Sequence, residues 1–562
     1  TTDTLTVQNY FSGSGNRIER VEFDDGTVWD ATVLGATPTR PTSSGNLFGT
    51  GGDDAIDLRH AANTAVTGPG WGSNLGNDTY LFGVGAGQDV IGDFDSTAGN
   101  VDTIRLIGTL PSGVTLSRGI GNDLAILING STDKLTVQNY FSGSGYRIER
   151  VVFDDGTSWQ EAYIWNHVQI VGGAGNDNLQ AVPGGDSLLK GYAGTDVLNG
   201  DSGNDTAYGG DGDDHLYGND GNDLLLGESG ADRLVGHAGD DRLDGGDGAD
   251  TLSGGDGSDA YYVEHVGDVV VETNADLATG GTDTVFSYLA AYTLGANIEN
   301  LRLMAAGNTD VTGNALANVL YASAGDNRID GGVGSDTVSY AYATAGVTAS
   351  LATGTATGGS GSDVLVAIEN LIGSSHTDLL RGDGGANRLS GAESSDFLDG
   401  GAGDDSLEGG AGVDTMWGGT GADSLIGGDG SDAYYVDHVG DVVVETNADL
   451  ATGGTDTVFS YLAAYTLGAN IENLRLMAAG NTDVTGNALA NVLYASAGDN
   501  RIDGGVGSDT VSYAYATAGV TISLATTAAQ ATGSSGFDTL IAIENLAGSN
   551  YNDSLAGNAA AN

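Results

Sequence analysis

The sequence predicts an all-β fold: a parallel β-roll, or β-helix solenoid, of nonapeptides with the pattern GGxGxDxUx and interspersed β-rich inserts. Three observations predict this fold. Glycine and aspartate recur every nine residues over long stretches, and the segments between these stretches are rich in Val, Thr and Tyr with alternating polarity. Helical periodicity is scarce, since segments such as IENL and ALANVL are too short to indicate helices.

The nonapeptides form two runs, Gly191 to Tyr262 and Gly373 to Tyr435. In the first run the sixth place is always aspartate: Asp196, Asp205, Asp214, Asp223, Asp232, Asp241, Asp250 and Asp259. Two looser units with Asp177 and Asp186 precede it, and Lys190 is one extra residue that shifts the nine-residue register between these units and the run. In the second run the sixth place holds Asp378, Asp396, Asp405, Asp414, Asp423 and Asp432, with Asn387 in one turn. The eighth place is apolar in the first run, which predicts one inward-pointing side chain for each unit.

Each unit divides physically into a six-residue turn, where glycines permit positive φ, and a three-residue strand. Two units make one coil with a strand on each side, so aspartates eighteen residues apart are expected to stack on the same edge. Asp196, Asp214, Asp232 and Asp250 then line one edge, and Asp205, Asp223, Asp241 and Asp259 line the other.

Longer repeats show that the chain is modular. Gly254–Thr348 recurs as Gly427–Thr521 with a single change, Glu264 to Asp437, and a segment from Leu5 recurs from Leu135 with an FDDGT that indicates a hairpin turn. The predicted divisions are 1–40, the tail of a preceding module; 41–165, a β module; 166–262, a first β-roll; 263–372, a β-rich insert with degenerate repeats; 373–435, a second β-roll; 436–547, a second copy of the insert; and 548–562, the start of a further roll. We therefore interpret the chain as a piece of something longer.

The composition limits the partners. With 76 acidic and 18 basic residues the formal net charge is −58, which argues against nucleic acid and anionic membranes and favours cations. The chain has no cysteine, so disulfides and thiolate metal sites are excluded, and no apolar run is long enough to be a transmembrane segment.

The stacked aspartates indicate calcium. Carboxylates on strands ~4.8 Å apart repel by roughly 3 kcal/mol per pair at an effective dielectric near 20, whereas one buried leucine contributes only ~1.5–3 kcal/mol. A hard divalent cation between turns converts this repulsion into coordination, and calcium accepts six to eight oxygens in flexible geometry. The candidate ligands are the aspartates at position six of both runs, Asp177 and Asp186, and further aspartates in glycine-rich stretches: Asp54, Asp78, Asp89, Asp336, Asp509 and Asp553.

The nonapeptide arrays resemble the RTX (repeats-in-toxin), or haemolysin-type, calcium-binding repeat. Gly76–Trp159 also resembles a module that accompanies such arrays in large bacterial exoproteins. The resemblance implies a parallel β-roll that folds on calcium outside the cell, after type I secretion as an unfolded chain. Asn387, Asn318 and Asn327 depart from the pattern at position six, and we expect their coils to bind calcium weakly or to be metal-free.

Other side-chain patterns are less specific. Asp95, Asp102 and Asp123 fit either further calcium ligands or turn residues, and the pairs Tyr261/Tyr262 and Tyr434/Tyr435 are expected to cap the apolar interior where each insert begins. No HExxH or GxSxG motif occurs, and nearly every segment has a copy elsewhere, so we predict that the chain is not an enzyme.

Two functions from different classes fit these observations. The first is an extracellular calcium-binding structural or adhesive array (stalk, surface layer or matrix fibre) of a secreted bacterial protein, with homo-assembly and a cell-surface or glycan partner left open. The second is the calcium-dependent folding and secretion module of a larger enzyme or toxin. Flanking sequence discriminates between them, since further long repeats favour the array and a non-repetitive catalytic domain favours the enzyme.

Overall fold

The computed structural model describes residues 20–22, 28–30, 55–59, 65–67, 76–118, 121–276, 278–449 and 451–560. They belong to two compact units: Thr1–Asp259 with Gly267–Val270, and Ala260–Val266 with Val271–Asn562. Strands and the turns between them make up nearly all of the described residues, so the predicted all-β class is confirmed.

The first unit begins with a β module. Its strands are β1 (Arg20–Glu22), β2 (Val28–Asp30), β3 (Ala55–Asp57), β4 (Ala65–Thr67), β5 (Thr79–Gly83), β6 (Gln88–Gly92), β7 (Thr103–Ile107), β8 (Val114–Arg118), β9 (Leu124–Ile128), β10 (Lys134–Val137), β11 (Arg150–Phe153) and β12 (Ser158–Gln160). Three short 3-10 turns, η2 (Pro111–Gly113), η3 (Tyr140–Ser142) and η4 (Ser144–Tyr146), and a helix, α2 (Glu161–Trp165), complete it. Strands β11 and β12 pair antiparallel on either side of the second FDDGT, so the predicted hairpin forms there; the first FDDGT lies outside the described residues, and β1 and β2 pair antiparallel as well.

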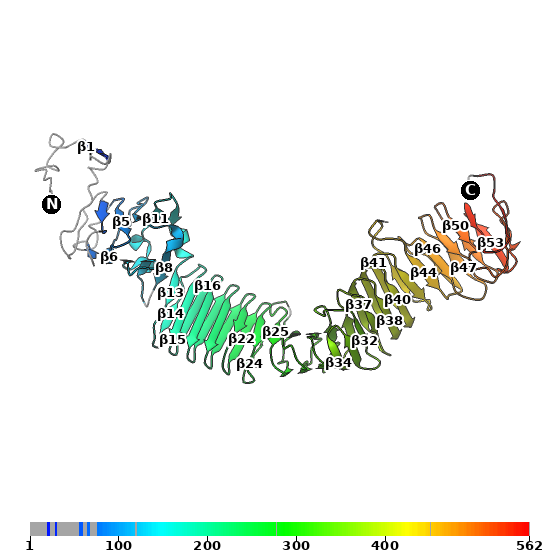
Figure 1. Ribbon diagram of the computed structural model, residues 1–562, viewed down its shortest axis with the longest axis horizontal. Coiled ribbons are helices and arrows are strands. Elements are labelled where there is room, and N and C mark those ends of the chain that lie inside the picture. The colour runs from blue at the N-terminus through cyan, green and yellow to red at the C-terminus, as the bar shows by residue number, and fades with distance from the viewer. Residues whose placement is uncertain are drawn as a thin grey trace, which may run out of the picture. The chain divides into compact units, whose positions relative to one another are not determined.

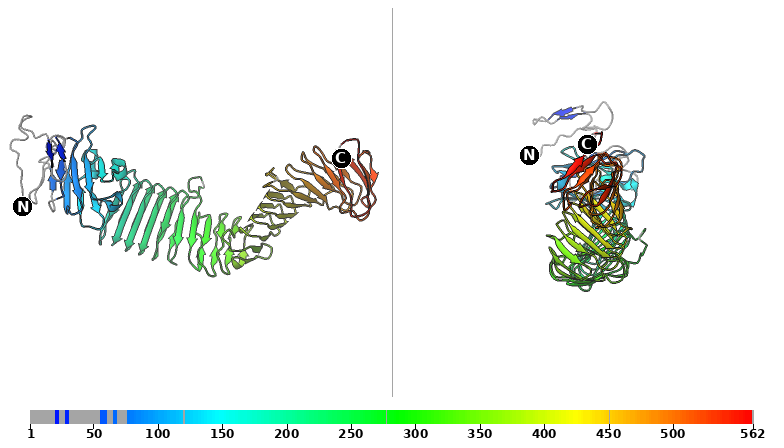
Figure 2. Two further views of the ribbon diagram at one scale, coloured as in Figure 1. Left: turned by 45° about the horizontal axis from the view of Figure 1, so that its top comes forward. Right: turned by 90° about the vertical axis from the view of Figure 1, so that its right-hand side faces the viewer.

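A parallel β-roll follows in the same unit, with successive strands alternating between two sheets. One sheet contains β13 (Gln169–Val171), β15 (Leu188–Ala193), β17 (Thr206–Asp211), β19 (Leu224–Ser229) and β21 (Arg242–Asp244). The other contains β14 (Asn178–Gln180), β16 (Val197–Ser202), β18 (His215–Asp220), β20 (Arg233–Ala238), β22 (Thr251–Asp256) and β24 (Val269–Val270). Figure 1 shows these strands stacked side by side, and the left view of Figure 2 shows them as a row of cyan to green arrows.

The roll has a narrow apolar interior built from one residue of each strand. Leu216 pairs in register with Leu234 in one sheet, and Leu225 lies in the other; all three side chains are fully buried. The residues on either side of each leucine are less buried because successive side chains in a strand point to opposite faces. The eighth position of the nonapeptide therefore forms the core, as its spacing predicts.

The second unit repeats this architecture over a longer stretch. Strands of one sheet are β23 (Ala260–Val263), β25 (Thr284–Ser287), β27 (Asn300–Leu303), β29 (Val319–Tyr321), β31 (Thr337–Ser339), β35 (Asn370–Ile372), β37 (Arg388–Glu393), β39 (Ser406–Ala411), β41 (Ser424–Asp429) and β43 (Val442–Val444). Strands of a second are β26 (Ala291–Thr293), β28 (Asp310–Thr312), β30 (Arg328–Asp330), β34 (Gly361–Val366), β33 (Thr355–Gly358), β32 (Val347–Ser350), β36 (Leu379–Arg381), β38 (Phe397–Ala402), β40 (Thr415–Thr420), β42 (Ala433–Val436), β44 (Thr457–Ser460), β46 (Asn473–Leu476), β48 (Val492–Tyr494), β50 (Thr510–Ser512) and β54 (Asn545–Ala547). Smaller sheets contain β45 (Ala464–Thr466), β47 (Asp483–Thr485), β49 (Arg501–Asp503), β52 (Gln530–Ala531) and β53 (Phe537–Ile541), and β51 (Thr521–Ser523) with β55 (Ser554–Ala556).

The segments predicted as inserts continue the parallel stacking of the second unit. In the regular run β38 and β40 are offset by eighteen residues, with Phe397 opposite Thr415, whereas β42 and β44 are offset by twenty-four, with Ala433 opposite Thr457. The antiparallel hairpin β32–β33 is one of the places where extra residues project from a coil. An insert is thus a run of coils of unequal length.

This continuity corrects the capping role predicted for the tyrosine pairs. Tyr434 is fully buried and Tyr435 stacks on Phe459 with ring centroids 4.8 Å apart. Because β42 goes on to pair with β44, the apolar interior does not end at these residues, and Tyr434 is part of the core. Among the described residues no helix combines the length and the apolar character that a membrane span requires.

Candidate metal centre

The aspartates at position six form a hydrogen-bonded ladder along each edge of the roll. The backbone N–H of Asp196 donates to Oδ1 of Asp214 at 2.7 Å, and the N–H of Asp214 donates to Oδ1 of Asp232 at 2.7 Å. On the other edge the N–H of Asp205 donates to Oδ1 of Asp223 at 2.6 Å. Each donor and acceptor are eighteen residues apart, so the stacking predicted from the spacing is present on both edges.

The second oxygen of these aspartates has a different environment. Oδ2 is buried and has no hydrogen-bond partner in Asp196, Asp205, Asp214, Asp223, Asp232, Asp241, Asp336, Asp396, Asp405, Asp414, Asp423, Asp432 and Asp509. A buried carboxylate oxygen without a donor is costly, so a whole row of them indicates that another group binds there.

The turns are built to leave room around this oxygen. A Cβ added to Gly209 would lie 2.5 Å from Oδ2 of Asp214 and 2.8 Å from the carbonyl oxygen of Gly227. Only glycine lets the backbone, a carbonyl of the next coil and the carboxylate come this close. The first glycine of the nonapeptide therefore brings carboxylate and carbonyl oxygens together, which are the ligands that calcium prefers.

Burial also perturbs the acidity of the ladder. Desolvation, together with the smaller effect of the charges of neighbouring aspartates, raises the pKa of Asp241 to about 8 and the pKa values of Asp205 and Asp232 to about 7. The same cause raises the pKa of Asp396 and Asp432 to about 7 in the second unit. A bound cation stabilises the ionised form that burial disfavours, so these residues fit calcium as ligands, together with carbonyl oxygens of the turns.

Asparagine at position six forms hydrogen bonds within the turn and to the preceding coil, so its side chain needs no cation. The side-chain amide of Asn387 donates to the carbonyl oxygen of Glu369 at 2.8 Å, and that of Asn318 donates to the carbonyl oxygen of Ile298 at 2.9 Å. Where aspartate leaves an oxygen without a donor, asparagine supplies a donor to the backbone of the preceding coil. Weak or absent calcium binding in these coils stays a prediction, and these two hydrogen bonds supply its physical reason.

Asp186 is placed differently from its prediction as a ligand. It is exposed, and Ser187 occupies the ladder position, with its N–H donating to Oδ1 of Asp205 at 2.6 Å. In regular units the aspartate precedes the buried apolar residue by two positions, but Asp186 precedes Leu189 by three. The one-residue shift in register therefore lies before Ser187 and turns Asp186 outward.

The remaining candidates fall into three groups. Asp378 and Asp553 each accept two backbone N–H groups, from Val347 and Ser374 and from Val520 and Ser549 respectively, and Asp177 accepts one from Gly173. Asp89 is buried in β6, and Asp250 and Asp259 continue the two ladders as acceptors from Asp232 and Asp241. Asp54 lies outside the described residues.

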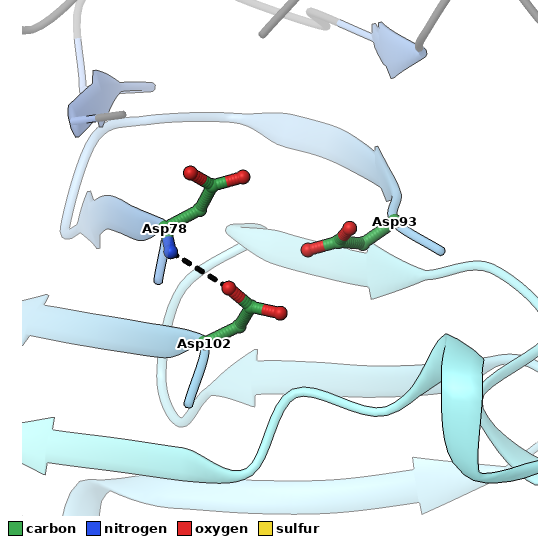
Figure 3. Close-up of side chains that lie close together, drawn as sticks. All are labelled: Asp78, Asp93 and Asp102. Carbon is green, nitrogen blue, oxygen red and sulfur yellow. Dashed lines mark hydrogen bonds between the residues drawn. The ribbon is translucent and has the colours of Figure 1, made fainter. Parts of the chain in front are cut away.

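The β module brings Asp78 together with two acidic residues that the candidate ligand set did not include, Asp93 and Asp102 (Figure 3). For Asp102, the sequence is compatible with either a calcium ligand or a turn residue. Asp95 and Asp123, its counterparts in that prediction, accept backbone N–H groups of Thr97 and Asn139 and so hold turns. In the second unit Glu445 and Asp456 meet Asp432 in the same way. Asp93, Asp102, Glu445 and Asp456 lie outside the nonapeptide pattern, so sequence periodicity does not identify them as ligands.

A parallel roll whose edges carry buried aspartates, each with an oxygen available to a cation, defines a calcium-binding repeat protein. Comparison with protein families agrees. The RTX calcium-binding nonapeptide repeat matches residues 190–225, 226–261, 306–340, 372–407, 408–437 and 479–513, and the haemolysin-type calcium binding protein related domain matches residues 1–33 and 123–163. The chain is therefore an RTX calcium-binding repeat protein.

A curated relative is similar over a short part of the chain. It is the iron-regulated protein FrpA of Neisseria meningitidis serogroup C, which is 37% identical over 113 residues. The match covers 20% of this chain and 10% of FrpA, so the chain corresponds to a small part of that protein's length.

Proposed function

We propose that this chain is a structural or adhesive array of a secreted bacterial protein, ordered by calcium outside the cell. The observation that carries the proposal is the stacking of coils in the second unit, where strands of regular and degenerate repeats belong to a common sheet and share one apolar interior. Such solenoids lengthen by adding copies, and the near-identical repeat Gly254–Thr348 and Gly427–Thr521 is a copy of this kind. A stalk, surface layer or matrix fibre uses this property.

The calcium requirement supports an extracellular location. The net charge of −58 and the buried ladder oppose folding where calcium is scarce, which keeps the chain unfolded before export. At the ~10⁻⁴–10⁻³ M calcium affinities of extracellular modules, the ladder sites fill and folding follows. We also propose that the chain has no catalytic activity of its own, since an active site needs unique sequence and nearly every segment here is repeated.

Chelation tests this proposal. We expect EDTA to abolish the β-sheet signal in circular dichroism, and calcium, but not magnesium, to restore it, because magnesium demands a tight octahedron and retains its waters. Electron microscopy of the refolded protein should then show fibres or lattices. Circular dichroism that is unchanged by EDTA would contradict calcium-dependent order, and monodisperse single particles would contradict the array.

A second candidate is supported by the similarity to FrpA, of which the match covers only 10%. In this alternative the chain is the calcium-dependent folding and secretion module of a larger secreted enzyme or toxin. The microscopy distinguishes the two functions, because a folding module of this kind remains a single particle at calcium concentrations that order the chain.

A further inference from the structure

Three acidic side chains converge in the β module, outside the nonapeptide ladder (Figure 3). Oxygens of Asp78, Asp93 and Asp102 all lie within 4.8 Å of one another, and the three residues are at most 3% exposed. The hydroxyl of Tyr80 donates to Oδ2 of Asp93 at 2.9 Å. The other oxygen of Asp93 is buried without a hydrogen-bond partner, and Figure 3 shows this carboxylate directed toward the other two residues.

The second unit contains the same arrangement in an unrelated segment. Oxygens of Asp432, Glu445 and Asp456 lie within 4.8 Å of one another, and all three residues are buried. The hydroxyl of Tyr434 donates to Oε2 of Glu445 at 2.9 Å. Oδ2 of Asp432 is buried without a hydrogen-bond partner.

The two clusters share a sequence pattern and a backbone contact. In each, a tyrosine follows the first aspartate by two residues, and the last aspartate follows the first by twenty-four. The N–H of Asp78 donates to Oδ1 of Asp102 at 2.7 Å, and the N–H of Asp432 donates to Oδ1 of Asp456 at 2.8 Å. The coil that begins here is therefore six residues longer than the regular eighteen, and its extra loop supplies the middle acid.

We propose that each of these clusters is a calcium site of a second kind, in which three carboxylates bind one ion and a tyrosine hydroxyl orients the middle carboxylate. Calcium–oxygen distances of about 2.3–2.6 Å place two ligands on opposite sides of an ion about 4.6–5.2 Å apart, which the 4.8 Å clusters accommodate. The other copy of the long repeat, Gly254–Thr348, carries the same residue types at Asp259, Tyr261, Glu272 and Asp283 in the sequence.

These sites differ from the ladder in charge. A regular turn presents one aspartate from each coil together with backbone carbonyls, whereas each cluster presents three carboxylates. Calcium affinity rises with the number of charged ligands, so the clusters should fill at lower calcium than the ladder. They lie where a coil changes length, and binding there ties the longer loop to the roll.

Crystals of the wild-type chain grown with terbium test the proposal without any substitution. Terbium takes the oxygen ligands of calcium, and its anomalous scattering locates the bound ions directly. We expect peaks between Asp78, Asp93 and Asp102 and between Asp432, Glu445 and Asp456, in addition to peaks along the ladder. Peaks along the ladder alone would overturn the proposal while leaving the proposed structural role intact.

Calcium titration by calorimetry tests the ligands in solution. Asp93→Asn and Glu445→Gln should each remove one ion from the tightest class, whereas the exposed residues Asp155 and Glu393 provide matched controls, Asp155→Asn and Glu393→Gln, that remove none. Tyr80→Phe should keep the ion count and weaken that site about tenfold, the lower end of the effect of losing an outer-shell partner. An unchanged tightest class in both Asp93→Asn and Glu445→Gln would overturn the proposal; if either variant fails to fold, the terbium positions decide.

Discussion

Aspartate and asparagine at position six of the repeat occupy the same place in the turn, but aspartate presents a second acceptor oxygen there and asparagine presents an amide donor. Asp405 leaves Oδ2 buried without a donor, whereas Asn387 on the preceding coil accepts the N–H of Asp383 and donates to the carbonyl oxygen of Glu369. The N–H of Asn387 still donates to Oδ1 of Asp405 at 2.7 Å, so the ladder continues through it. The group at this place in the side chain, a carboxylate oxygen in aspartate or an amide NH₂ in asparagine, therefore determines whether the turn needs a cation.

This contrast predicts that Asn387→Asp gains a calcium ion. Without calcium the variant loses an amide donor and buries an unpaired oxygen, which should lower its stability by about 1–3 kcal/mol. With calcium the new carboxylate becomes a ligand and the stability should recover to at least that of the wild type. Urea unfolding in EDTA and in calcium, with ion counting by calorimetry, checks both outcomes.

The control for this variant adds the same charge outside the ladder. Asn222 is an exposed turn residue, so Asn222→Asp should leave the ion count unchanged. A variant of Asn387 that binds no additional ion, or one that is as stable as the wild type in EDTA, would show that the amide is not the substitute for calcium.

At the scale of the ladders, each of the two edges of the roll is a row of carboxylates whose pKa values burial raises. The pKa rises to about 6 for Asp214 and Asp223, about 7 for Asp232 and about 8 for Asp241. In the unfolded chain the same groups titrate near 4, so between pH 4 and 8 the folded state binds more protons than the unfolded state. Without calcium, stability therefore decreases as the pH rises through this range.

We accordingly predict that protons partly replace calcium. In EDTA the β-sheet signal should be weak at pH 8 and should increase as the pH falls toward 5, because protonation removes the buried charges. In calcium the dependence should reverse, with order present at pH 8 and calcium affinity lost at acid pH as protons compete for the carboxylates. Circular dichroism against pH under both conditions measures the effect.

Added salt separates this effect from the general repulsion of the acidic surface. Salt screens exposed charges strongly and buried charges much less. If 1 M sodium chloride at pH 8 restored the β-sheet signal in EDTA as fully as acid does, the surface charge, and not the ladder, would control folding.

Periodicity predicts the elements of the roll but not the coils that break the period. The eighth-position leucines and the eighteen-residue stacking follow from strand geometry, because every unit has the same length. Ser187 lies in the ladder, and Glu445 and Asp456 lie in the acidic cluster, because their coils contain extra residues. Packing against the preceding coil determines at which point of the coil these extra residues loop out. The nine-residue period, which describes only units of equal length, does not determine that choice.

Across the second unit, turns of the two chemistries alternate along a single stack. Asparagine lies at position six in the coils of Asn318 and Asn327, and again at Asn491 and Asn500; the aspartate run Asp396–Asp432 lies between these segments. Each coil contacts chiefly its neighbours, so the stability of each segment depends on its own turns and on the coils beside it. The aspartate turns are therefore flanked on both sides by asparagine turns, whose side-chain polar groups have hydrogen-bond partners within the protein.

The order of opening on calcium removal follows from this arrangement. Solenoids ordinarily fray from their ends, but here we predict that strands β39, β40 and β41 lose hydrogen-exchange protection at higher calcium than β29, β30, β48 and β49. The reason is that, once calcium is removed, each turn of the aspartate run contains a buried charge without a partner. The side-chain amides of Asn318 and Asn491, in contrast, keep their hydrogen bonds to backbone carbonyl oxygens. Hydrogen exchange with mass spectrometry across a calcium titration measures the order, and saturating calcium, where both sets are protected, is the internal control. Simultaneous opening, or loss of the flanking strands first, would show that coupling between coils outweighs the chemistry of the turns.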